Sequence, residues 1–356
     1  MDAKRVSFFH ELLNTPSPSG YEQDVQVLWR ADVAPHADDV RTNSHGSAIA
    51  TLRGIEGGPS ILLLGHCDEI GLLIHYIDDS GFLYFKCIGG IDGPTLVNQQ
   101  IRLMGPGGIV RGVIGRMAVH LLKNEEKNSG SIDSSKLYID IGARSREEAE
   151  AVVPVGTPGV IGGDVTPLLN GRIAARDVDN KFGCFVAAEV LRRVAARKKD
   201  LVATLYSAST VQEECGVWDA RSVAYECRPT AAIAIDVTHA SDTPDDDKKR
   251  DGDFPLGKGP IIKTGVLSSK KLVAAVRDAG VKAGLNVRIK AETGRHGTDA
   301  DPSAAVRAGV PVTTVACALR YMHTSVEVVE IEEIDQVCTM LAEFVLSVRV
   351  GANYAP

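Results

Sequence analysis

Histidine, aspartate and glutamate side chains recur near the carboxyl ends of predicted strands in this 356-residue chain, and one further carboxylate opens a long predicted helix. Two imidazoles with several carboxylates form the ligand set that suits zinc, cobalt or manganese. Each residue alone is more often a turn or helix cap, but their coincidence at one edge of a predicted sheet favours a metal site. The residues concerned are His66, Asp68, Asp179, Glu213, Glu214, Asp236 and His323.

Spacing separates the roles that these residues can take. In His66-x-Asp68 both side chains point to the same side of an extended segment, so Asp68 can orient the imidazole without binding the ion itself. Glu213 and Glu214 are adjacent and cannot easily share one face, so if one binds a cation the other is free to accept a proton from water. An ordinary first turn of a helix, where acidic residues suit the dipole, is the alternative for this pair. The pair alone leaves both interpretations open.

The elements that must position these residues follow a βα rhythm at both ends of the chain. Helical spacing at 6–13 and 22–34 predicts two helices before the first strand at 46–53, and the continuous apolar run 61–64 predicts a buried strand of a mixed or parallel sheet. The rhythm resumes with a helix at 180–197, a strand at 201–211, a helix at 218–226, a strand at 231–235, a helix at 268–284, a strand at 286–291, a helix at 299–308, a strand at 312–316 and a final helix at 331–348.

Between these two parts the sequence pattern predicts short strands separated by glycine, at 71–77, 82–85, 100–104 and 112–115. Strands with hairpin turns and almost no helix indicate a separate β-rich module, which ends near the Gly/Pro-rich run 156–159. We therefore predict an α/β catalytic domain built from residues 1–66 and 166–356, interrupted by an inserted β-rich domain at 67–165.

Composition excludes several kinds of partner. The net charge of −7, with no clustered basic surface beyond a helix end, disfavours nucleic acid and anionic membranes. No signal-peptide-like apolar run opens the chain and no window could span a membrane, so we expect a cytoplasmic protein. The seven cysteines are scattered without a Cys-x-x-Cys pair, which favours neither disulfides nor a thiolate zinc site.

Competing signals fail on inspection. The glycines at 252–259 have the spacing of a phosphate loop, but they lack its Ser or Thr and follow no buried strand. Neither a Gly-x-Ser-x-Gly elbow nor a His-Glu-x-x-His pair occurs. Cys67, between His66 and Asp68, is expected to pack inward rather than act as a nucleophile. Three further histidines without partners in the motif set are interpreted as structural, namely His75, His120 and His239.

Six motifs occur along the chain in a fixed order: GHCDEIG at 65–71, DNKFG at 179–183, VQEECG at 211–216, AIDVT at 234–238, GTDA at 297–300 and RYMHT at 320–324. In this order they resemble the successive motifs of the tetrahedral (TET) aminopeptidases, the family of glutamyl and deblocking aminopeptidases, some of which were once labelled endoglucanases. The resemblance covers nearly the whole chain. It implies a phosphorylase/hydrolase-like α/β catalytic domain with a mixed sheet and a β-barrel or PDZ-like insert that serves for dimerisation.

The resemblance also implies a function: release of the amino-terminal residue from short peptides with a free amino terminus, by a homodimer that assembles further into a homododecamer. Two divalent metal ions per subunit would be needed, zinc first, with cobalt or manganese as alternatives. The family pattern gives Asp179 the bridging position, His66 and Asp236 one ion, Glu214 and His323 the other, Glu213 the general base, and Asp68 the orientation of His66. It also includes a cis peptide after the bridging aspartate, here Asp179–Asn180.

Other functions stay open on the sequence alone. A related dinuclear hydrolase acting on glycans or N-acyl amino acids would need the same ions, and a non-catalytic metal-binding assembly protein would need no base. Retention of Glu213 favours an enzyme. The charged loop 242–253 and the pair Arg295 and His296 depart from the common pattern and leave the preferred first residue open. These two side chains could favour an acidic first residue, or they could be a surface arginine and a turn histidine.

Overall fold

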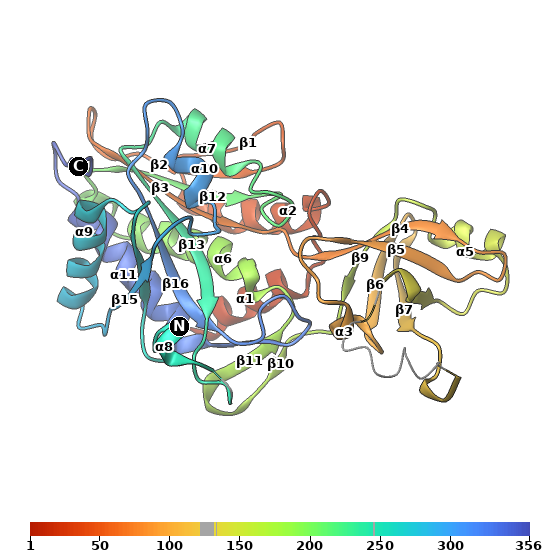
Figure 1. Ribbon diagram of the computed structural model, residues 1–356. Coiled ribbons are helices and arrows are strands. Elements are labelled where there is room, and N and C mark those ends of the chain that lie inside the picture. The colour runs from red at the N-terminus through yellow and green to blue at the C-terminus, as the bar shows by residue number, and fades with distance from the viewer. Residues whose placement is uncertain (122–131, 133, 245) are drawn as a thin grey trace.

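A mixed eight-stranded sheet forms the centre of the larger part of the molecule, which the computed structural model describes over residues 1–121, 132, 134–244 and 246–356 (Figure 1). The order across the sheet is β1-β2-β12-β3-β13-β16-β14-β15. The bounds are β1 Asp39–Thr42, β2 Ala48–Leu52, β3 Ser60–His66, β12 Thr204–Thr210, β13 Ala231–His239, β14 Ile261–Gly265, β15 Arg288–Glu292 and β16 Val312–Leu319.

The four central strands β12, β3, β13 and β16 run parallel, whereas β2 and β14 pair antiparallel to their central neighbours. Strands covered on both faces read as continuous apolar runs, and Ile61 to Leu64 in β3 are all fully buried. Because the central strands are parallel, their carboxyl ends meet at one edge, which confirms the predicted α/β class and mixed sheet.

Helices cover both faces of this sheet (Figure 1). Alternate residues of β3 and β13 contribute to two separate cores, so Leu63 packs with one layer and Leu64 with the other. The first layer holds α1 Ala3–Asn14, α2 Gln23–Val33, α6 Val178–Ala195, α9 Lys270–Lys282 and α11 Ile331–Ser347, and the second holds α7 Ala220–Cys227 and α10 Ala300–Ala304.

Helix α6 lies directly on β3 and β13 because two glycines allow the backbones to touch. A Cβ on Gly65 would lie 2.4 Å from the carbonyl carbon of Gly183, and a Cβ on Gly183 would lie 2.3 Å from the carbonyl oxygen of Ile235. No side chain fits in either place. The first turn of α6, which carries Asp179, is thereby held against the carboxyl ends of both strands.

A closed barrel of six strands, in the order β4-β5-β8-β7-β6-β9, lies to one side of the large sheet (Figure 1). Apolar side chains from all six strands and from the helix α5 meet in the barrel's own core, and β9 contributes its last residue, Ile161. The bounds are β4 Gly71–Ile77, β5 Leu83–Ile88, α3 Gly93–Leu96, β6 Gln100–Gly105, β7 Gly108–Gly115, β8 Tyr138–Asp140, α5 Arg146–Val152 and β9 Pro158–Ile161. The predicted boundaries at 67 and 165 stay a prediction; residues 122–131 and 133 of that insert lie outside the described part.

A small three-stranded antiparallel sheet and several short turns complete the fold. The sheet consists of β10 Thr166–Pro167, β11 Arg172–Ala175 and β17 Glu327–Glu330, in the order β10-β11-β17, and α8 Lys248–Asp251 lies in the charged loop. Short 3-10 turns occur at Ala34–His36, Val119–Leu121, Ser134–Lys136, Leu169–Gly171 and Lys198–Asp200. No helix within the described residues is long and apolar enough to cross a membrane.

The predicted α/β elements are present with shifted ends, with two informative differences. Two strands of the sheet were not predicted: β1, a four-residue edge strand of mostly polar residues that precedes the predicted first strand, and β14, which is short and follows a glycine-rich run. Strand β13 continues past the predicted end at 235 to His239, since it stays paired with β16 as far as Leu319. Asp236 therefore lies within a strand rather than beyond it.

Candidate functional site

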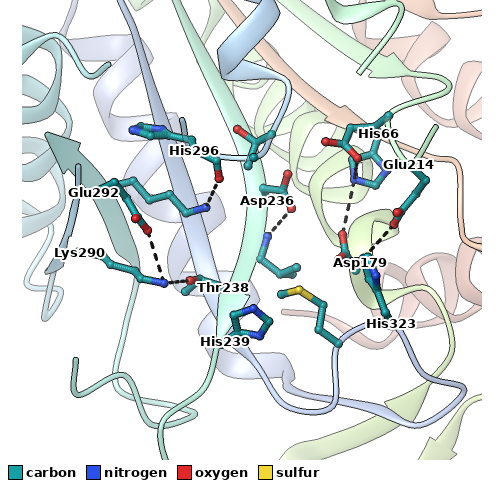
Figure 2. A pocket seen from close by; sticks show the side chains of 16 residues that line it. His66, Asp179, Glu214, Asp236, Thr238, His239, Lys290, Glu292, His296 and His323 are labelled. Carbon is teal, nitrogen blue, oxygen red and sulfur yellow. Dashed lines mark hydrogen bonds and ion pairs between the residues drawn. The ribbon is translucent and has the colours of Figure 1, made fainter. Parts of the chain in front are cut away.

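A cavity of about 320 Å³ opens at the carboxyl ends of β3, β12, β13 and β16. Six of the seven residues singled out in the sequence line it. Figure 2 shows the side chains of five of these residues, which converge from separate parts of the chain: His66, Asp179, Glu214, Asp236 and His323. Asp68 is the exception: its side chain is fully buried behind the cavity wall. The six lining residues are His66, Asp179, Glu213, Glu214, Asp236 and His323.

Asp179 lies between the two imidazoles. One of its carboxylate oxygens is 3.5 Å from His66 Nε2, and the other is 3.5 Å from His323 Nε2. Two groups share it: ligand atoms of His66, Asp179 and Asp236 lie within 4.8 Å of one another, as do those of Asp179, Glu214 and His323. A third such group joins His66 to Glu213 and Glu214, so the two adjacent glutamates do reach the same imidazole.

Both imidazoles are held by their other nitrogen. Nδ1 of His66 lies 3.0 Å from the backbone oxygen of Asp68, and Nδ1 of His323 lies 2.9 Å from the backbone oxygen of Gly90. A carbonyl can only accept, so Nδ1 carries the proton and Nε2 is left to face the carboxylates in both rings. Gly90 belongs to the segment between β5 and α3, so the barrel side of the molecule supports His323.

The backbone of Asp179 is fixed on both sides. Its N–H donates to the carboxylate of Glu327 at 3.0 Å, which also accepts the N–H of His323 at 2.8 Å. Asn180 donates to the carbonyl of Ile235 at 2.8 Å, beside Asp236, and the expected cis peptide joins Asp179 to Asn180. Glu327 was missed in the sequence because its partner Asp179 is 148 residues away, and no local pattern signals such a bond.

Asp68 does more than the sequence predicted. Its carboxylate is 3.4 Å from Nδ1 of His66, and it accepts the backbone N–H groups of Glu213 and Glu214 at 3.0 and 3.1 Å. The hydroxyl of Ser19 donates to it at 2.6 Å. The proposed base and its neighbour therefore project from a backbone that Asp68 holds.

The cavity carries more carboxylates than cations. Burial raises the pKa of Glu213 to about 9, with His66 opposing and Asp236 reinforcing the rise. Burial and the nearby Asp179 raise the pKa of Asp236 to about 7. Hydrogen bonds to Asp179 and Glu214 raise the pKa of His323 to about 11. Divalent cations would neutralise this excess of negative charge, so the donor set fits metal ions.

Three residues close to the proposed ligands have clear surroundings in the structure. Cys67 is fully buried, and burial raises the pKa of its thiol. Both observations agree with the expectation that Cys67 packs inward and is not a nucleophile. Asp177, the residue just before α6, makes no capping hydrogen bond and instead forms an ion pair with Lys181, which braces the turn. His239 was interpreted as a structural histidine, but it lines the cavity. It reaches the cavity because β13 extends to His239, further than predicted.

At the far end of the cavity, Arg295 matches the surface-arginine alternative, whereas His296 is buried in the cavity wall. His296 lines the cavity but is bound by Thr314 and Ser268, and Arg295 is exposed and is not among the lining residues. The lining cations are Lys263 and Lys290. They come from β14 and β15, two strands at the edge of the sheet, and the sequence interpretation did not single them out.

Comparison with known proteins identifies the class. The family described as M42 glutamyl aminopeptidase matches residues 46–340. The lysyl aminopeptidase of Pyrococcus furiosus is 32% identical over 330 residues, which cover 91% of this chain and 92% of that protein. The fold, the cavity and these matches define the protein as a peptidase hydrolase that acts as an aminopeptidase. The chain belongs to the M42 family, in agreement with the TET-type resemblance of its motifs.

Solved structures agree over the full length. A TET aminopeptidase from the marine sediment archaeon Thaumarchaeota archaeon SCGC AB-539-E09 superposes with a TM-score of 0.92 at 28% identity, covering 97% of this chain and 96% of that one. The Pyrococcus horikoshii TET1 peptidase, described as assembling into a tetrahedron or a large octahedral shell, has a TM-score of 0.85 at 28% identity and covers 96% and 99%. The predicted fold class, with its catalytic sheet and barrel, is confirmed.

Proposed function

We propose that this aminopeptidase uses two divalent metal ions to release the first residue of short peptides with a free amino terminus. His66, Asp179 and Asp236 would hold one ion, and Asp179, Glu214 and His323 the other. The observation that carries the proposal is Asp179, whose two oxygens face two imidazoles at 3.5 Å each. When bound, such ions activate water and polarise the scissile carbonyl.

Glu213 has the position of a general base in this scheme. It lines the cavity, its Oε2 lies 3.8 Å from His66 Nε2, and it belongs to neither of the two groups that share Asp179. A carboxylate beside the metal ligands can accept the proton of the attacking water and return it to the leaving amine. Burial raises the pKa of Glu213 to about 9 in the metal-free chain, and bound cations would favour its ionised form.

Substitution of the base tests the mechanism. Glu213→Gln keeps the shape of the side chain but cannot accept a proton, so hydrolysis of amino-acyl anilides should fall by about two orders of magnitude or more. Metal content, measured by mass spectrometry of the purified protein, should stay at two ions per subunit as proposed above. Turnover equal to that of the parent protein would rule out Glu213 as the base.

We further propose that the first residue is acidic. Lys263 is only 6% exposed, and its ammonium donates to the backbone oxygen of His296 at 3.0 Å. No carboxylate within the described residues forms an ion pair with it, whereas Lys290 already pairs with Glu292 at 3.5 Å. A buried cation that faces a cavity without a counter-ion fits an anionic side chain. The family description as glutamyl aminopeptidase supports this choice, although the Pyrococcus furiosus relative is named for lysine.

The substrate panel is Glu-, Leu- and Lys-anilides with the parent protein and with Lys263→Met. We expect the parent to prefer Glu, and Lys263→Met to lose most of that preference while it keeps Leu hydrolysis. Best hydrolysis of Lys-anilide would instead assign the subsite to Glu292. That result would refute the acidic preference and leave the aminopeptidase mechanism standing.

Blocked peptides separate the two enzyme alternatives. An aminopeptidase loses activity when the amine of the substrate is acylated, whereas an N-acyl amino acid deacylase requires the acyl group. A glycan hydrolase would hydrolyse neither the free nor the blocked peptide. A non-catalytic metal-binding assembly protein would bind the ions and hydrolyse none of these substrates. Zinc, cobalt and manganese supplied in turn to metal-free protein would identify the ion, with zinc as our first choice.

We also propose that the barrel mediates a homodimer and that dimers form a homododecamer. The similarity to shell-forming TET peptidases supports the proposal. Mass in solution, by light scattering, tests it. Domain boundaries at 67 and 165, the cytoplasmic location and the absence of nucleic-acid and membrane partners stay predictions.

A further inference from the structure

The turn at 15–22 between α1 and α2 is paired with the carboxyl end of β3. The N–H of Glu69 donates to the carbonyl of Ser17 at 3.0 Å, and the N–H of Ser19 donates to the carbonyl of Glu69 at 3.2 Å. The Ser17 hydroxyl adds a bond to the carbonyl of Cys67 at 2.7 Å. A segment that the sequence interpretation treated as a connection between helices thus lies against the residues that follow His66.

Ser19 extends this contact to the site. Its side chain is 7% exposed, and its hydroxyl donates to Oδ2 of Asp68, an oxygen that also accepts the N–H of Glu214. The other oxygen accepts the N–H of Glu213. Among the described residues no lysine or arginine pairs with this fully buried carboxylate. Its charge is therefore stabilised by these three donors and the more distant ring of His66.

Glu22, at the other end of the turn, is a buried carboxyl group near Asp68 and near Gln212, the residue before Glu213. Burial raises the pKa of Glu22 to about 7, and hydrogen bonds from the backbone of Gly20 and Gln212 oppose the rise. Gln212 has a positive φ of 60°, a conformation that a non-glycine residue adopts only when its surroundings hold it. The hydrogen-bonded path from the turn to the loop 212–214 runs from Ser19 through Asp68.

We propose that Ser19 is a positioning residue for the loop 212–214, acting through the carboxylate of Asp68. Without its hydroxyl, Oδ2 of Asp68 keeps one donor and the carboxylate can turn away from the loop. Glu213 and Glu214 would then lose their fixed backbone, while His66 and Asp236 keep theirs. The inference rests on the proposed function, in which Glu213 is the base and Glu214 binds one of the two ions.

Ser19→Ala, with Ser17→Ala as its matched control, tests the inference. Both serines are buried in the same turn, but the Ser17 hydroxyl bonds only a carbonyl. For Ser19→Ala we expect kcat to fall about 10- to 100-fold, as when an outer partner of a metal ligand is lost, with KM little changed. On dialysis against zinc buffered at decreasing free concentrations, one ion per subunit should leave earlier than in the parent protein. Ser17→Ala should melt earlier but keep kcat and both ions.

Ser19→Thr retains the hydroxyl and should restore kcat and the second ion. If Ser19→Ala does not fold, Ser19→Cys, a weaker donor of similar size, should show an intermediate loss. Parent-like kcat and metal retention in Ser19→Ala, or equal losses in Ser17→Ala, would overturn the inference. A parent protein that binds no divalent ions or hydrolyses no anilide would instead refute the proposed function.

Discussion

At the scale of single residues, the site depends on where protons and carboxylate oxygens face. In His66 and His323, Nδ1 forms a hydrogen bond with a backbone carbonyl, so Nε2 of both rings faces Asp179. Asp179 offers one oxygen to each ring, and of the two groups that contain Asp179, one includes Asp236 and the other includes Glu214. Asp179 is therefore the single residue on which both proposed ions depend.

Asp179→Ala should remove both ions, whereas Asp236→Ala should remove one. The physical reason is that Asp179 belongs to both groups within 4.8 Å and Asp236 to only one. Ion counts per subunit by mass spectrometry after gel filtration check this. One ion at full occupancy in Asp179→Ala would show that the bridging assignment is wrong.

Glu327→Ala should damage the site without touching a proposed ligand. The variant leaves the backbone N–H groups of Asp179 and His323 without their acceptor in a buried place, and each costs about 1–3 kcal/mol. We expect a lower midpoint in urea and weaker metal retention. Glu330→Ala is the control: Glu330 is on the same strand as Glu327, and its loss removes a half-buried ion pair with Arg172 of β11, so it should destabilise the protein less than Glu327→Ala.

At the scale of elements, the site exists because α6 lies on the ends of β3 and β13. Backbone contact at Gly65 and Gly183 brings the first turn of α6 within reach of His66 and Asp236. A side chain at either glycine would separate the helix from the strands, and the ligands with it.

Gly183→Ala is therefore expected to be strongly destabilising, by about 1–3 kcal/mol or more, since its Cβ would lie 2.3 Å from the carbonyl oxygen of Ile235. Metal retention should fall as well. Gly163→Ala is the matched control, because its Cβ would meet nothing within 4 Å, and it should be neutral. Thermal melting of the three proteins, each with and without zinc, checks the prediction. Equal melting of Gly183→Ala and the parent would contradict this account of α6.

At the scale of the whole molecule, the large sheet and the barrel meet at the site. The backbone oxygen of Gly90, from the barrel side, accepts a hydrogen bond from Nδ1 of His323. The neighbouring Gly89 is also close to the site, because a Cβ there would lie 3.4 Å from side-chain atoms of Glu214. The barrel, for which we propose a role in assembly, therefore also supports His323, a ligand of the proposed second ion.

Removal of metal should destabilise the whole chain. Ions bind the folded cluster far better than the separated ligands of the unfolded chain, so zinc at about 100 times its dissociation constant adds about 2.7 kcal/mol. We expect chelated protein to melt at a lower temperature and to recover on addition of zinc. A melting temperature that does not respond to chelator or zinc would argue against resident metal.

The sequence by itself determined the α/β class, the β-rich insert, the motif order and the six side chains that line the cavity, because local periodicity and residue type carry that information. Asp68 was also identified, but its bonds to Glu213 and Glu214 were not. Only the tertiary structure shows the contacts of Glu327, Ser19 and Lys263. Their partners are 148, 49 and 33 residues away, and such contacts depend on how the strands are ordered in the sheet rather than on any local pattern.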